Sequence, residues 1–233
     1  MPNSTKAKIA GTDTKPKIFH PKGKQNGGVI VIAHGSDGLV DTPHGKWKTM
    51  IMKYAKDLSD RGFVVVIPDY FAITKTKPPE TPQEFVGRDR WQTALADTVA
   101  NASKLPGIDA SRVGLLGFSL GGHLCLRLRS TAKVLVSFFA PLLPELGGIG
   151  PGGGHPLHGL LHHGRKVPGG AGDTLVDYAN ATSIEVILRK EGADVTLIPY
   201  DGAGHGFVGT DPSNTKARTD SKVSTLAFFE KYL

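Results

Sequence analysis

The segment RVGLLGFSLGGH, residues 112–123, decides the fold predicted for this chain. Its apolar run, Val113 to Leu116, suits a buried strand, and a helix-like segment follows from Leu120 to Arg129. Between them, Ser119 has one glycine two positions before it and another two positions after it. A strand, a sharp turn and a helix in this order are the context of a G-x-S-x-G nucleophile elbow, in which the glycines leave room for a crowded backbone. Ser119 is therefore the candidate nucleophile; the alternative is an incidental serine in a Gly-rich turn.

Strand-like and helix-like segments alternate on both sides of this elbow. The apolar runs are typical of strands buried on both faces, and the amphipathic runs are typical of helices that cover a sheet. This alternation predicts one three-layer α/β sandwich with a mostly parallel sheet, whose ligands would bind at the carboxyl ends of the strands. Strands are expected at residues 29–33, 63–67, 113–116, 133–140, 157–162 and 195–199. Helices are expected at residues 45–61, 120–129, 177–191 and 213–231, with one more between Thr81 and Pro106.

The length and composition fit one globular domain, predicted to span residues 28–233. The chain has 233 residues, of which 39% are hydrophobic and 21% charged. Residues 1–27 form a basic arm whose lysines contribute to the formal net charge of +7. A basic arm could contact nucleic acid, but no aromatic or glycine-arginine pattern accompanies these lysines. A solvated, poorly ordered arm and no nucleic-acid partner are therefore expected.

The sequence favours a cytoplasmic protein that does not interact with a membrane. No apolar run approaches the ~18 residues that span a bilayer, and the N-terminus lacks the apolar core of a signal peptide. The single cysteine, Cys125, excludes an intramolecular disulfide. An exported protein whose signal had been removed would share these features.

A serine hydroxyl needs a base to accept its proton and an acid to orient that base. In a sheet of this kind the chain order is Ser, then Asp or Glu, then His. His205 is the candidate base, because it follows the last predicted strand on the turn DGAGHGF; a surface-loop histidine is the alternative. Asp173 is the candidate acid, because it follows the preceding strand, although it could serve only as a helix cap. Asp177 is the competing carboxylate.

An oxyanion formed at Ser119 needs N–H donors that are already in place. The backbone N–H of Leu120, directly after the nucleophile, is the first candidate. The second is the backbone N–H of Ser36, or of Asp37, in the turn after the first buried strand. The side chain of His34 is expected to form hydrogen bonds within this turn rather than to act as a second base.

Five motifs give the chain a resemblance to the dienelactone hydrolase family of α/β-hydrolases. They are HGSDG at 34–38, VVIPDY at 65–70, GFSLGG at 117–122, DTLV at 173–176 and GHGF at 204–207. The resemblance implies an α/β-hydrolase fold with little or no lid, and esterase or lactonase activity on a small molecule without a metal or an organic cofactor. The family's namesakes carry cysteine in place of Ser119 and a glutamate in the first turn, so a serine carboxylesterase is expected rather than a hydrolase of dienelactone.

Further residues are candidates for contact with the substrate or for lining its site. Asp37 and Tyr70 lie in the motifs at strand ends, and Arg88 or Arg90 could meet a substrate carboxylate, unless they are solvated helix charges. Residues 144–172 are rich in glycine, proline and histidine, but the histidines lack the spacing and the partner ligands of a zinc site. This segment is therefore expected to line the active-site mouth, with no metal. Its histidines are His155, His158, His162 and His163.

Together these residues predict a serine hydrolase that cleaves small carboxylic esters or lactones through an acyl-enzyme intermediate. The same groups would serve a peptidase or a thioesterase, because a fold does not fix the bond that is cleaved. A catalytically silent α/β-hydrolase that acts as a binding module is the alternative from another class. A monomer or a homodimer is expected.

Overall fold

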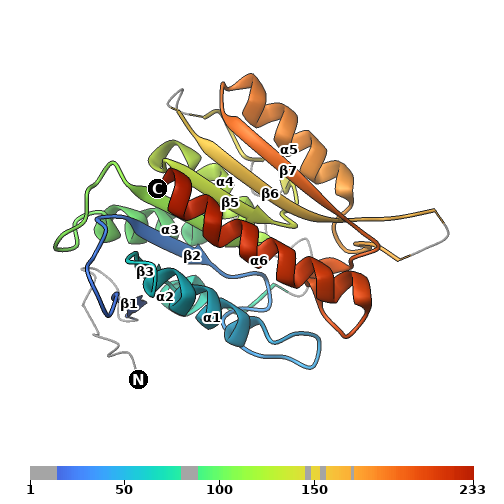
Figure 1. Ribbon diagram of the computed structural model, residues 1–233, viewed down its shortest axis with the longest axis horizontal. Helices are drawn as coiled ribbons and strands as arrows, with labels where there is room; N and C mark the ends of the chain where they lie inside the picture. The colour runs from blue at the N-terminus through green and yellow to red at the C-terminus, as the bar shows by residue number, and fades with distance from the viewer. Residues whose placement is uncertain (1–14, 80–88, 145–147, 153–155, 169–170) are drawn as a thin grey trace.

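The computed structural model describes residues 15–79, 89–144, 148–152, 156–168 and 171–233. These residues form a seven-stranded sheet in the order β1-β3-β2-β4-β5-β6-β7 (Figure 1). β1 runs antiparallel to β3, and all other neighbours are parallel, which requires crossovers made here by helices. The strands are β1 (Lys17–Phe19), β2 (Val29–Ala33), β3 (Val64–Ile67), β4 (Val113–Phe118), β5 (Val134–Phe138), β6 (His158–Arg165) and β7 (Asp194–Asp201).

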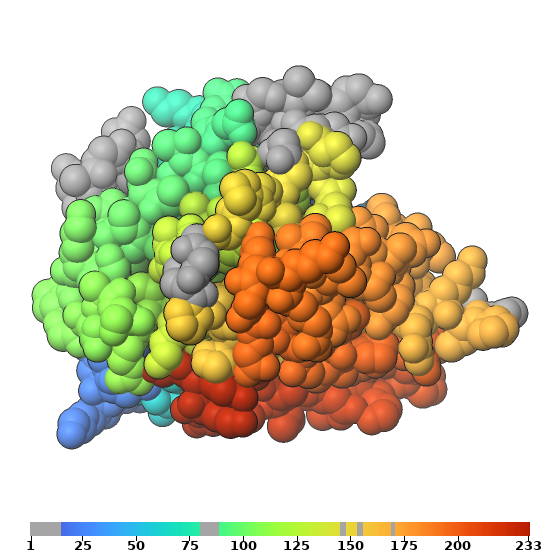
Figure 2. Space-filling model, turned by 90° about the horizontal axis from the view of Figure 1, so that it is seen from above, coloured from blue at the N-terminus to red at the C-terminus, as the bar shows by residue number. Residues whose placement is uncertain are grey.

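Helices cover both faces of the sheet and give the three layers that were predicted. α1 and α6 pack against one apolar cluster, whereas α2, α3, α4 and α5 pack against a second cluster on the opposite face. In Figure 2, the view from above, α3 (green) and α6 (red) lie on opposite sides of the molecule. None of the described helices is long and apolar enough to cross a membrane. The helices are α1 (Trp47–Ser59), α2 (Tyr70–Thr74), α3 (Asp89–Ala102), α4 (Leu120–Arg127), α5 (Tyr178–Lys190) and α6 (Pro212–Tyr232), with short 3-10 turns η2 (Arg129–Thr131) and η4 (His205–Phe207).

The strands divide their side chains between the two apolar clusters. In β2, Val29 and Val31 belong to the cluster beneath α3, and Ile30 and Ile32 belong to the cluster beneath α1. Successive side chains of a strand point to opposite faces, so a strand covered on both sides is apolar at every position. The continuous apolar runs in the sequence have this physical origin.

The predicted fold class is confirmed, and the predicted strands and helices overlap the observed ones. Two elements were not predicted. β1 lies within the expected arm, where it pairs with β3 and buries Ile18. α2 follows directly on β3, and the carboxylate of Asp69 caps it by accepting the backbone N–H of Ala72. The helix start expected at Thr81 lies outside the described residues.

His158, His162 and His163 belong to strand β6 and not to a loop at the mouth of a site, contrary to the expectation for segment 144–172. His162 is buried on β6, and its ring is hydrogen-bonded to the hydroxyls of Tyr200 and Thr225 at 2.9 and 3.1 Å. Burial lowers the pKa of His162 to about 3, so this ring is neutral and structural. His158 begins the same strand, and His155 lies outside the described residues. Within the described part of the chain, no three His, Cys, Asp or Glu side chains gather to hold a metal ion.

A buried arginine ties the segment after β5 to the helices of one face. The guanidinium of Arg129 donates two hydrogen bonds to the carboxylate of Glu191, at 2.8 and 2.6 Å. Its other N–H groups donate to the carbonyls of Leu126, Ile149 and Gly150. All five donors of the guanidinium are thereby used, which is what a group that is only 2% exposed requires. The hydrogen bonds from Arg129 hold the pKa of Glu191 below its usual range.

We predict that Glu191→Gln lowers the free energy of unfolding by about 2 kcal/mol, because a charge-assisted pair is lost while Arg129 stays buried. The pKa of Glu191 is lowered in the folded state, so its stabilisation is present above the ordinary glutamate pKa and is lost as the pH falls through the folded value. The difference between wild type and variant in urea unfolding should therefore shrink below about pH 4. Glu185→Gln, which breaks an exposed pair with Arg189, is the control and should change stability by less than about 0.5 kcal/mol.

Candidate active site

Ser119 stands at the turn between β4 and α4 in a strained backbone conformation, with φ 51° and ψ −117°. A positive φ outside glycine costs about 1–3 kcal/mol and persists only where the surroundings enforce it. Gly117 and Gly121 permit the close backbone packing that holds Ser119 in this conformation. A Cβ on Gly117 would lie 2.4 Å from the carbonyl oxygen of Gly121, and a Cβ on Gly121 would lie 2.3 Å from those of Ala33 and His34. No larger residue fits at either position.

Ser119, His205 and Asp173 form a hydrogen-bonded chain at the carboxyl edge of the sheet. The Ser119 Oγ lies 3.1 Å from Nε2 of His205, and Nδ1 of His205 lies 2.8 Å from Oδ2 of Asp173. When Nδ1 donates its hydrogen to the carboxylate, Nε2 presents its lone pair to the serine hydroxyl. The fold thus brings together the three side chains that were predicted from the sequence to be the nucleophile, the base and the acid.

Asp173 reaches the base although a long segment separates it from Gly164 on β6. Residues 166–168 and 171–172 lie outside the sheet, and Figure 1 shows them projecting beyond the end of β6. The two ends of this segment pack closely, because a Cβ on Gly172 would lie 2.4 Å from Cα of Lys166. A Cβ on Gly164 would lie 3.4 Å from Cβ of Asp173. The segment therefore leaves the carboxylate next to the strand.

The surroundings of Asp173 favour its ionised form. Its side chain is fully buried, and Oδ1 accepts the backbone N–H groups of Leu175 and Val176 at 2.9 and 2.8 Å. Burial alone would raise the pKa of Asp173, but the hydrogen bond and charge of His205 outweigh it and hold the pKa below its usual range. A second histidine, His163, lies 3.5 Å from Oδ2 and donates from Nε2 to the carbonyl of Val176 at 2.9 Å. Burial lowers the pKa of His163, so this ring is neutral.

The turn that carries His205 is held by the first turns of α6. Asn214 accepts the backbone N–H of Gly204 at 2.8 Å and donates to the carbonyl of Val208 at 2.6 Å. Arg218 donates to two further carbonyls of the same turn. Neither residue was predicted from the sequence, because polar side chains at the start of a surface helix usually contact solvent. The only available signal was their position at the start of the helix that follows the candidate base.

The turn after β2 lies against the elbow. A Cβ on Gly35 would lie 3.5 Å from Cβ of Ser119, so Ser36, the next residue, is also close to Ser119. The N–H of Leu120 is the first of α4 and has no acceptor within the helix. In the described part of the chain, no hydrogen bond occupies the backbone N–H of Leu120 or of Ser36. Both groups therefore remain candidate oxyanion donors.

His34 and Tyr70 form a buried stack beneath this turn. Their ring centroids are 3.9 Å apart, and Nδ1 of His34 lies 2.9 Å from the carbonyl oxygen of Gly35. The Tyr70 hydroxyl donates to the carbonyl of His34 at 2.7 Å. Tyr70 was expected to contact substrate, but α2 turns its ring fully into the core, where burial raises the pKa of the hydroxyl. His34 forms its hydrogen bond within the turn, as expected.

A cavity of about 310 Å³ borders Ser119 and His205 and is sized for a small molecule. Asp37, the residue proposed from the sequence to contact the substrate, is among its lining residues. Arg88 lies outside the described residues, and Arg90, on α3, is exposed and is not among the lining residues. Most of the wall is apolar. It includes Trp47, Met50, Ile51, Phe118, Phe139 and Val208.

One curated relative resembles part of the chain. A protein of Synechocystis sp. named "Putative carboxymethylenebutenolidase" is 31% identical over 121 residues. The match covers 48% of this chain and 47% of the relative, so it spans about half the length of each protein.

Solved structures with low sequence identity share the fold over nearly the whole chain. A dienelactone hydrolase-like promiscuous phosphotriesterase from metagenomic libraries has a TM-score of 0.69 at 20% identity, covering 99% of this chain and 97% of that one. Dienelactone hydrolase from Anabaena variabilis has a TM-score of 0.66 at 17% identity, covering 100% and 99%. An acylaminoacyl peptidase from Pyrococcus horikoshii has a TM-score of 0.70 at 14% identity, covering 100% of this chain and 42% of its own.

The sequence itself decides the family. The model of the dienelactone hydrolase family matches residues 16–233, which includes β1 as well as the elbow, the acid turn and the turn of His205. The chain belongs to the dienelactone hydrolase family of α/β-hydrolases, with Ser119 at the turn between β4 and α4.

Proposed function

We propose that this protein is a serine hydrolase that cleaves small carboxylic esters or lactones through an acyl-enzyme intermediate. The observation that carries this proposal is the continuous chain from Ser119 through His205 to Asp173, at 3.1 and 2.8 Å, beside a small apolar cavity. Membership of the dienelactone hydrolase family supports it, since hydrolysis of an ester or lactone needs these groups and no cofactor.

The geometry suggests a role for each group. Nε2 of His205 accepts the hydroxyl proton while Oγ of Ser119 attacks the acyl carbon. The N–H groups of Leu120 and Ser36 stabilise the oxyanion, and the ionised Asp173 stabilises the imidazolium. The same proton then passes to the departing alcohol oxygen, and the acyl group stays on Ser119. A water molecule that gives its proton to His205 attacks the acyl-enzyme, and the acid is released as Oγ regains its hydrogen.

Two alternatives cleave a different bond, and a third cleaves none. A peptidase or a thioesterase would use the same hydrogen-bonded chain, and a panel of thioesters and aminoacyl p-nitroanilides separates these activities from ester hydrolysis. A silent binding module needs none of the three side chains, and their alignment at hydrogen-bonding distances favours an active enzyme.

The oligomeric state and the cellular compartment expected from the sequence are part of this proposal. We expect a monomer or homodimer in the cytoplasm that acts on a small molecule. The lone Cys125 is buried in the core, where it is unavailable for a bridge between subunits.

We predict that Ser119→Ala lowers kcat/KM for a short-chain p-nitrophenyl ester by about 10⁴-fold or more, because the nucleophile is lost while the cavity is kept. Ser183→Ala, at an exposed position on α5, is the matched control and should leave activity unchanged. Equal activity of wild type and Ser119→Ala would contradict the proposal, as would the absence of activity from wild type on every acyl length.

We predict that Asp173→Asn lowers kcat by about 10³- to 10⁴-fold, because the amide no longer holds His205 in the tautomer that accepts the serine proton. Asp177→Asn is the matched control, since Asp177 only caps α5 by accepting the N–H of Ala179 and asparagine caps equally well. Steady-state kinetics of both variants on the same ester decide the assignment. A large loss in Asp177→Asn with none in Asp173→Asn would reverse it.

A further inference from the structure

The apolar wall of the active-site cavity separates it from two neighbouring hollows. One hollow of about 390 Å³ shares His44, Trp47, Met50 and Val208 with the cavity beside Ser119. A groove of about 650 Å³ between α1 and α6 shares Met50 with both. Residues that line two hollows form the partition between them. Trp47 and Met50 supply the large side chains of this partition.

The indole of Trp47 is fitted between two glycines. A Cβ on Gly45 would lie 2.4 Å from Cε2 of the indole, and a Cβ on Gly206 would lie 2.1 Å from Cη2. Gly206 directly follows the candidate base His205, so the indole fills the space between the start of α1 and the turn that carries this base. The ring of Trp47 occupies the space that a side chain at either glycine would need.

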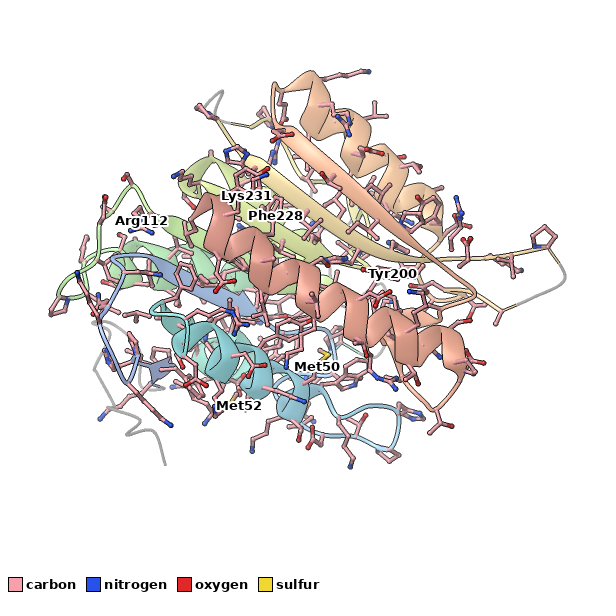
Figure 3. All side chains as sticks on the ribbon, viewed as in Figure 1. Met50, Met52, Arg112, Tyr200, Phe228 and Lys231 are labelled. Carbon is pink, nitrogen blue, oxygen red and sulfur yellow. The ribbon has the colours of Figure 1, made fainter. Side chains whose placement is uncertain are left out.

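The indole is held by packing rather than by a hydrogen bond. Nε1 of Trp47 is buried, and it has no hydrogen-bond partner among the described residues. Shortening this side chain therefore breaks no hydrogen bond of the indole and opens a passage between the two hollows. Met50, which Figure 3 shows between α1 and α6, closes the route toward the groove. The hollows beyond the wall have apolar surface that a longer alkyl chain can bury.

We propose that Trp47 and Met50 are the specificity-determining residues that limit the length of the substrate's apolar chain, and that the protein is selective for short-chain esters. This inference rests on the proposed ester hydrolysis at Ser119. The side chains of Trp47 and Met50 bound the 310 Å³ cavity on this side. A longer chain finds no space on that side of the reacting carbonyl until Trp47 or Met50 is shortened.

The test compares chain-length profiles of wild type, Trp47→Ala, Trp47→Leu and Met50→Ala. The readout is the ratio of kcat/KM for an octanoate ester to kcat/KM for a butyrate ester, using p-nitrophenyl esters for the acyl side. Octyl and butyl acetates, followed by acid release, test the alcohol side. A ratio within one variant cancels any general loss of efficiency that arises because Trp47 packs against the turn of His205.

We expect the ratio to rise by about ten-fold or more in Trp47→Ala on at least one side, since each added methylene that becomes buried contributes up to about four-fold. Met50→Ala should shift the ratio in the same direction. Met52→Ala is the matched control, because Met52 lies on the side of α1 away from α6 in Figure 3 and lines none of the three hollows. Its ratio should match that of wild type.

Three outcomes overturn the inference while leaving ester hydrolysis intact. The first is an unchanged ratio in both Trp47 variants, for the acyl side and for the alcohol side. The second is a shift in Met52→Ala as large as that in Trp47→Ala. The third is a wild-type protein that already hydrolyses the octanoate ester faster than the butyrate ester. Thermal unfolding shows whether Trp47→Ala is folded, and if it is not, Trp47→Leu decides. Failure of the proposed function itself is distinguishable, because wild type then hydrolyses neither ester, or Ser119→Ala hydrolyses both as fast as wild type.

Discussion

The close approach of the elbow to the end of β2 is the constraint on which the rest of the site depends. Gly121 lies so near the carbonyls of Ala33 and His34 that a single added carbon would be 2.3 Å from each oxygen. This contact fixes where α4 begins, and it holds Ser119 at a positive φ that an isolated chain would avoid. The turn after β2 therefore packs directly against the strained Ser119, which brings Ser36 close to this serine and to Leu120.

The parallel sheet supplies the remaining groups from neighbouring strands. Because all strands from β2 to β7 are parallel, the segments that follow them meet at one edge. Asp173 follows β6 after a longer segment and His205 follows β7 after a short turn, and both reach the edge where Ser119 follows β4. Hydrogen bonds hold both side chains in position. Asp173 accepts two backbone N–H groups, and the turn of His205 is held by Asn214 and Arg218.

The parts of this structure that the sequence could predict are those with a local signature. The elbow needs glycines at fixed positions, and buried strands need continuous apolar runs. Ser119 and the sheet could therefore both be predicted. The chain order then led to His205 and Asp173. β1 and α2 are too short to have a periodicity, and the histidines of β6 were misread because a neutral, hydrogen-bonded histidine can occupy a core position in a strand. Trp47 depends on contacts with Gly206, more than a hundred residues away, for which one sequence carries no signal.

The central claim, that Ser119 is a nucleophile activated by its neighbours, is tested most directly by covalent labelling. Wild-type protein is treated with a fluorophosphonate, which phosphonylates an activated serine, and is then digested with trypsin and analysed by mass spectrometry. The geometry predicts one adduct per chain, confined to the peptide of residues 113–127 and located on Ser119. An unmodified protein, or an adduct on a serine outside this peptide, would contradict the account.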